Sequence, residues 1–160
     1  MANTYEKLDN LIFNDLDGKC VVFRNFAGKE SRWNQQGKRT FNIMLTEEEA
    51  LELEAKGWRI KKLNPKKEGD PVAYTLKVRV SFGLYPPKVY LVTSHKKTLL
   101  DDEDVSQLDK AEIVNADLII TPYINRDESY ASDGKASAYL KLAYFTIPDN
   151  PFEDKYADYE

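Results

Sequence analysis

The segment 73–81 carries large apolar side chains at every second position and mostly polar ones between them, and this pattern constrains the fold more than any other part of the chain. It reads AYTLKVRVS, so apolar side chains occupy one face while Lys77 and Arg79 lie on the other. A repeat of two residues is typical of a strand with one buried face. The chain must build a core against one side of this strand and leave its basic side to solvent or to a ligand.

Further strand patterns predict a mainly β protein. They cover Lys19–Phe26, Arg39–Leu45, Lys88–Thr93, Ala116–Ile124 and Ala138–Ile147, with a weaker one at Trp58–Leu63. Thr46 and Glu49 form a capping box that predicts a helix over Thr46–Lys56, ended by Gly57, and a short second helix is predicted near Glu103–Leu108. One helix after an early hairpin, with long polar loops, fits the OB-fold, a five-stranded, partly open Greek-key barrel. An SH3-like barrel or another β-rich fold is the alternative.

The length of 160 residues predicts one domain, which we expect over residues 1–147, followed by a tail over 148–160. The single Cys20 cannot form an internal disulfide, which favours a reducing compartment. The N-terminal sequence lacks the features of a signal peptide, and no apolar run reaches the ~20 residues of a membrane helix. These features predict a cytoplasmic protein without a membrane partner.

Charge is segregated along the chain, which has a net charge of −4. The segment 149–160 holds five acids and one base, so the residues before it are neutral overall. Within them, the segment 19–97 carries 17 bases against 8 acids, whereas the segment 98–148 carries 4 bases against 10 acids. Segregation of this kind creates a local field that can attract an anionic partner to the basic half.

Two apolar arms joined by a polar loop make up the segment 21–45, which reads VVFRNFAGKESRWNQQGKRTFNIML. The loop surrounds Trp33 with cations. This pairing suits single-stranded nucleic acid, because Lys and Arg neutralise phosphates while an exposed ring stacks on an unpaired base. The competing interpretation is that the loop ring packs back onto its own sheet.

Strand alternation divides the residues of this region between core and surface. Phe23 shares a face with Val21 and is assigned to the core together with Phe41 and Ile43, whereas Phe26 shares a face with Arg24. The predicted phosphate contacts are Arg24, Lys29, Arg32, Lys38, Arg39, Lys77 and Arg79. Phe26 and Trp33 are the preferred base-stacking rings, and Trp58 and Tyr130 are further candidates, although Trp58 at a helix end also suits an anchoring role.

Catalytic constellations are sparse. His95 is the single histidine, and neither a Walker-type phosphate loop nor a GxGxxG turn occurs. The acids at 101–104 resemble a helix start more than a metal site. We therefore expect a binding protein without metal or cofactor. Two other classes stay open: a structural or adaptor protein that assembles into a particle, and a Mg²⁺-dependent nuclease using scattered carboxylates such as Glu112 and Asp117.

The C-terminal stretch combines acids with aromatic rings. Such a tail can dock into basic, apolar pockets of partner proteins or compete with DNA for the chain's own groove. Packing on the body or simple disorder is the alternative. The candidate partner-binding residues are Phe152, Glu153, Asp154, Tyr156, Asp158, Tyr159 and Glu160.

Five blocks, the segment 21–45 followed by EEEALELEAKGWRIKKL, YPPKVYLVTSHKKTLL, NADLIITPY and FEDKYADYE, resemble the single-stranded DNA-binding proteins encoded by tailed bacteriophages. The similarity runs from about Asn14 to the C-terminus. It implies an OB-fold core that coats unpaired DNA during phage replication and recombination in the bacterial host, and an acidic tail that recruits replication proteins. Tails of this family often end in an aromatic residue, whereas here Tyr159 precedes Glu160. Exposed strand edges would also permit a homodimer.

Overall fold

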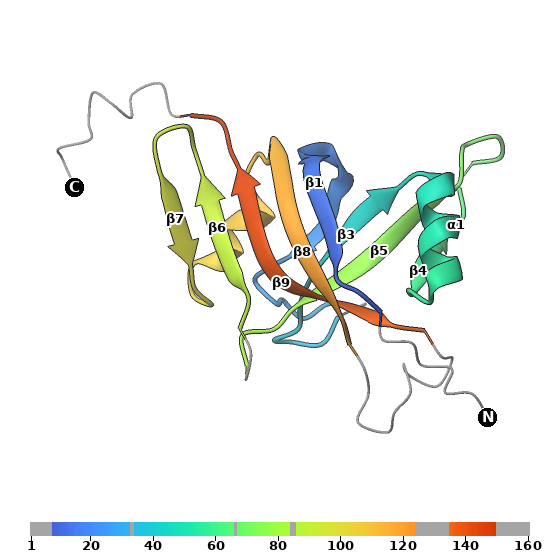
Figure 1. Ribbon diagram of the computed structural model, residues 1–160, viewed down its shortest axis with the longest axis horizontal. Helices are drawn as coiled ribbons and strands as arrows, with labels where there is room; N and C mark the ends of the chain where they lie inside the picture. Colours follow the sequence, from blue (N-terminus) through green and yellow to red (C-terminus); the bar gives the residue numbers. More distant parts are fainter. Residues whose placement is uncertain (1–7, 33, 66, 84–85, 124–134, 150–160) are drawn as a thin grey trace.

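The computed structural model describes residues 8–32, 34–65, 67–83, 86–123 and 135–149 and shows a mainly β protein with one α-helix, which confirms the predicted class (Figure 1). The elements are β1 (Leu11–Asp17), the 3₁₀ turn η1 (Gly18–Cys20), β2 (Val21–Asn25), β3 (Arg39–Leu45), α1 (Glu47–Lys56), β4 (Ile60–Leu63), β5 (Ala73–Val80), β6 (Lys88–Val92), β7 (Lys97–Leu100), the 3₁₀ turn η2 (Val105–Asp109), β8 (Asn115–Tyr123) and β9 (Ser137–Thr146). None of the helices in these described ranges is long and apolar enough to cross a membrane.

The strands follow a path that returns to its starting segment. In order they are β1-β8-β9-β5-β3-β2, where β5 and β9 are parallel and the other neighbouring pairs are antiparallel. Because η1 joins β1 directly to β2, these two behave as one long bent strand that pairs with β8 at its start and with β3 at its end. Counted in this way, five strands enclose a barrel, in agreement with the OB-fold prediction.

Gly18 permits the bend between β1 and β2. Its backbone N–H donates to the carbonyl oxygen of Val114 at 3.0 Å. A Cβ atom at this position would lie 1.7 Å from the carbonyl oxygen of Ile113, so only glycine allows the two chain segments to approach this closely. The closure of the barrel on the β8 side therefore depends on glycine, which has no side chain, at position 18.

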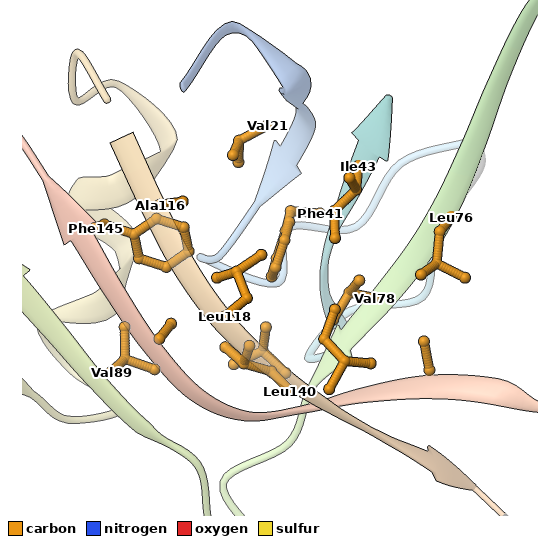
Figure 2. Close-up of a cluster of buried hydrophobic side chains, with 14 of the residues drawn as sticks. Val21, Phe41, Ile43, Leu76, Val78, Val89, Ala116, Leu118, Leu140 and Phe145 are labelled. Carbon is orange, nitrogen blue, oxygen red and sulfur yellow. The ribbon is translucent and has the colours of Figure 1, made fainter. Parts of the chain in front are cut away.

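The barrel encloses a core of aromatic and branched side chains (Figure 2). Phe26, Phe41 and Phe145 are fully buried and pack on one another, with ring centroids 5.2 to 5.9 Å apart. Leu76 and Val78 enter from β5, so the apolar face predicted for the segment 73–81 is confirmed. Since these side chains point inward, Lys77 and Arg79 on the alternate positions lie on the outer face of the barrel.

Helix α1 begins and ends as its sequence predicts. The Thr46 hydroxyl accepts from the backbone N–H of Glu49 at 3.1 Å, and the Glu49 carboxylate accepts from the N–H of Thr46 at 2.9 Å. Gly57 closes the helix in the left-handed conformation, with φ of 111°. Directly after it, Trp58 is buried, which anchors the helix end to the barrel.

Three strands lie outside the five-stranded path. β4 pairs with the first half of β5, and the antiparallel hairpin of β6 and β7 pairs with the second half of β9 (Figure 1). Neither β1 nor β7 was predicted. The alternation of β1 is interrupted by a register shift between Phe13 and Leu16, and β7 has only four residues.

Strand β2 departs from regular alternation. Its pairing with β3 shifts between Val22 and Asn25, and Phe23 adopts a left-handed backbone conformation with φ of 50°. This bulge reverses the facing of the residues that follow it. The assignment of Phe23 to the core and of Phe26 to the surface is therefore wrong: Phe23 is 61% exposed and Phe26 is fully buried.

Candidate nucleic-acid interface

A basic row, formed by Lys77 and Arg79, lies on the outer face of the barrel on β5, beside β3. Thr40 pairs with Arg79 and Asn42 pairs with Lys77, so both cations lie on the outer face beside the polar side chains of β3. Partial burial lowers the pKa of Lys77, and the neighbouring charges of Arg79, Lys61 and Lys38 lower it further. Three further cations therefore lie close enough to Lys77 to affect it, and this part of the surface favours an anion.

A hollow of about 470 Å³ opens at the end of this row, where β3 begins and β5 ends. Its lining comprises Gly37, Lys38, Arg39, Thr40, Arg79, Val80, Ser81, Phe82, Gly83, Asp102 and Tyr139. Three of these residues are cations and one is an acid. The cations belong to β3, β5 and the loop before β3, so a phosphate in the hollow is best accommodated on that side, away from Asp102.

Two tyrosines bring aromatic faces to the same region. Tyr139 on β9 is the register partner of Arg79 on β5, and it lines the hollow. The ring of Tyr123 on β8 lies 5.0 Å from that of Tyr139 between centroids, and Tyr123 is 47% exposed. Neither tyrosine was a predicted site residue. The alternation of the strand pattern at 138–147 placed Tyr139 opposite the buried positions and could have identified it.

The loop that precedes β3 is held by its own hydrogen bonds. The Asn34 amide donates to the carbonyl oxygens of Lys29 and Lys38, each at 2.9 Å, and the N–H of Gly37 donates to the carbonyl of Gly28 at 2.7 Å. These bonds fix the base of the loop, so that Lys38 reaches the hollow from a defined position.

Arg39 combines a structural and an electrostatic role. Its guanidinium donates to the carbonyl oxygen of Phe26 at 2.6 Å and lies 5.6 Å from the ring centroid of Phe82. The side chain is half-buried yet lines the hollow. Because its direction is fixed, it loses little conformational freedom when an anion binds.

The structure reassigns three predicted site residues. Arg24 is half-buried, and its guanidinium donates to the carbonyl oxygens of Leu108 and Ala111, so it fastens η2 to β2. Phe26 is fully buried and Trp58 is 1% exposed, so neither ring can stack on a base. Phe26 is buried because of the bulge in β2, and Trp58 is buried because it anchors the end of α1 to the barrel.

The remaining predicted residues divide between exposed positions and positions outside the described residues. Lys29 and Arg32 are exposed on the loop before β3. Together, Lys38, Arg39, Lys77 and Arg79 form the group that the fold gathers at the hollow and along the basic row. The predicted sites outside the described residues are Trp33, Tyr130, Phe152, Glu153, Asp154, Tyr156, Asp158, Tyr159 and Glu160.

Among the described residues, no cluster of three or more His, Cys, Asp or Glu side chains could hold a metal ion. In the acidic run at 101–104, the Asp101 carboxylate accepts from the backbone N–H groups of Glu103 and Asp104 at 2.9 and 3.0 Å. The run therefore closes a local turn before η2.

Similarity to known proteins indicates the family of the chain. No match exists among curated proteins. A solved structure, that of gp2.5, a single-stranded DNA-binding protein encoded by bacteriophage T7, is similar with 16% sequence identity and a TM-score of 0.36, over 95% of this chain and 96% of that chain. The sequence model of the family described as "Putative phage ssDNA-binding domain" matches residues 2–160. Since this match spans nearly the whole sequence, the chain belongs to the family of phage single-stranded DNA-binding domains.

Proposed function

We propose that the protein binds single-stranded DNA, without strong sequence preference, across the outer face of β3, β5 and β9. The observation that carries this proposal is the junction of the basic row with the tyrosine pair: Arg79 and Tyr139 are register partners on adjacent strands. One strand of DNA can therefore place a phosphate on the guanidinium while a base meets the neighbouring ring.

The cations and the rings contact features that all nucleotides share, which explains the expected lack of sequence preference. Phosphates, which every nucleotide carries, contact Lys38, Lys77 and Arg79. The electrostatic contribution of these contacts to affinity weakens as salt rises. Tyr123 and Tyr139 stack on bases, and every base presents a π-face. Trp33 is a further proposed stacking residue.

Exposed rings favour a single strand over a duplex. In a duplex the faces of the bases are occupied by their neighbours, so a ring can stack only after a base is unstacked, at a cost of a few kcal/mol. The cations contact either form. We therefore expect the difference between single strand and duplex to come from Tyr123 and Tyr139.

Membership of the family supports a proposal for the biological setting. We propose that the protein coats DNA during phage replication and recombination in the cytoplasm of the bacterial host, acting by binding and not by catalysis. Residues 1–147 supply the DNA-binding domain. The acidic tail over 148–160 recruits replication proteins or competes with DNA, and the chain could also pair as a homodimer.

A titration with labelled oligo-dT tests the proposal. The logarithm of affinity should fall with the logarithm of salt concentration, with a slope of about −0.7 for each neutralised phosphate, and the matching duplex should bind more weakly. Replacement of both tyrosines by leucine should reduce the preference for the single strand. Equal or tighter binding to duplex would contradict the proposal.

Two additional arms separate the other classes of function. Oligonucleotide that is degraded when Mg²⁺ is added, and spared by a chelator, would indicate a nuclease. An absence of salt-dependent binding would indicate an assembly protein. Deletion of residues 150–160 should strengthen DNA binding at low salt if the tail competes with DNA, and this deletion keeps Asp149, whose carboxylate accepts from the Ser94 N–H at 2.8 Å.

A further inference from the structure

Phe23 is exposed on a backbone that a bulky residue rarely adopts. Its φ is 50°, in the left-handed region, and its side chain is 61% exposed, more than any other aromatic side chain among the described residues. Left-handed backbone suits glycine and is unfavourable for a residue with a Cβ atom. An exposed apolar ring adds no packing that would offset this cost.

Contacts of the neighbouring residues explain why the chain bulges at position 23, but they do not explain why the residue there is aromatic. Arg24 is tied to the carbonyl of Leu108 at 3.0 Å, and Phe26 is locked in the core, where Asp109 accepts from the N–H of Ala27 beside it at 3.1 Å. These contacts require the chain to bulge between Val22 and Asn25. Glycine at position 23 would allow the same contacts. The fold therefore explains the backbone conformation of residue 23 but does not require an aromatic side chain there.

The position of Phe23 relates it to the basic row. Val22 and Asn25 pair with Asn42 and Thr40 of β3, which in turn pair with Lys77 and Arg79 of β5. Phe23 therefore lies level with the row and two strands away, about 10 Å between backbones at the usual strand spacing. A strained residue beside a binding surface is a recognised sign of function.

We propose that Phe23 is a base-stacking residue of the interface, and this inference rests on the proposed single-stranded DNA binding. Its ring provides the face for an unpaired base of a strand whose phosphates lie along Lys77 and Arg79. The bulge then has a role, because it turns an aromatic side chain out of the barrel at the edge of the basic surface.

Glycine at position 23 separates this role from a structural one, because it relieves the backbone and removes the ring at once. The Phe23→Gly variant should melt at the wild-type temperature or above it, yet bind oligo-dT roughly 5- to 150-fold more weakly, the range for loss of one stacked base. Phe23→Tyr should keep its affinity within about threefold, since a tyrosine ring also stacks. The matched control is Leu51→Ala, which removes a side chain that is 56% exposed on α1 and should leave affinity unchanged.

An oligonucleotide with abasic sites provides the decisive comparison. Wild type and Phe23→Gly should bind the abasic strand with equal affinity, because the phosphates remain and the bases do not. Wild-type protein that binds oligo-dT no better than Phe23→Gly does would overturn the inference while leaving the proposed function intact. A lower melting temperature of Phe23→Gly, or a change confined to self-association in sedimentation, would assign the ring to packing or to a second copy. Failure of the wild type to bind any single strand would overturn both.

Discussion

Replacement of Lys77 by glutamine should change stability and DNA binding in opposite directions. Burial and the charges of Arg79, Lys61 and Lys38 lower the pKa of Lys77 in the folded protein. The charged lysine therefore costs folding free energy at neutral pH, and the cost disappears only as the pH rises through the folded pKa toward the unfolded value. Lys77→Gln removes the cost at all pH values, so the variant should be as stable as the wild type or more stable, by about 0.5 kcal/mol or less for an exposed side chain.

DNA binding by the same variant should become both weaker and less sensitive to salt. Loss of one phosphate contact reduces the salt slope by about 0.7 for a single strand. Between 50 and 200 mM salt, a fourfold change, the ratio of wild-type to variant affinity should therefore shrink by a factor of about 2.6.

Urea unfolding and oligo-dT titration at several salt concentrations measure the two effects. Lys56→Gln is the matched control, because Lys56 lies on α1 and its exposed ion pair with Glu52, at 3.3 Å, contributes little to stability. The control should keep the wild-type slope. A Lys77→Gln protein with an unchanged slope, or with a large loss of stability, would refute the assignment of this lysine to the interface.

Three further variants probe other parts of the structure. Gly18→Ala should destabilise the protein by about 2 kcal/mol or more, because its Cβ would meet the Ile113 carbonyl, and an unchanged urea midpoint would argue against the tight bend. Phe26→Leu should cost about 1 to 2 kcal/mol through lost core packing, with the DNA affinity of the folded protein unchanged; unaltered stability with weaker binding would instead return the ring to the interface. The hydroxyl and then the N–H of Ser94 lower the pKa of Asp149, so this contact stabilises the fold above the unfolded pKa and is lost as pH falls through the folded value. Ser94→Ala should raise the pKa of Asp149 toward its ordinary value in an NMR titration, and no change would show that the contact is not formed in solution.

Sequence patterns predicted the elements whose side chains follow one period from end to end. In the segment 73–81 apolar and polar side chains alternate from Tyr74 onward, and the segment 39–45 has apolar side chains at every second position from Phe41. Both segments form strands at those positions. The Thr46 capping box is equally local, since its partners are three residues apart. The bulge in β2 was not predictable in this way, because it arises from contacts of Arg24 and Phe26 with η2 and the core, far away in sequence.

In the candidate site, too, local sequence patterns indicate some residues, whereas others depend on contacts between distant segments. The cations of β5 were predicted because their own strand shows which face they occupy. Strand alternation could place Tyr139 on the outer face, but its position beside Arg79 depends on the parallel arrangement of β5 and β9, which no local pattern indicates. Trp58 was predicted as a further stacking ring, whereas the packing of the α1 end against the barrel buries it.

Backbone NMR of the protein with oligo-dT tests most directly whether the outer face of β3, β5 and β9 is the interface. The account predicts that the amide signals changing on titration cluster at Lys77, Arg79 and Tyr139, extend to Phe23 in β2, and leave α1 unaffected. Changes that cluster on α1 and β4 and leave the outer face of β3, β5 and β9 unaffected would contradict it.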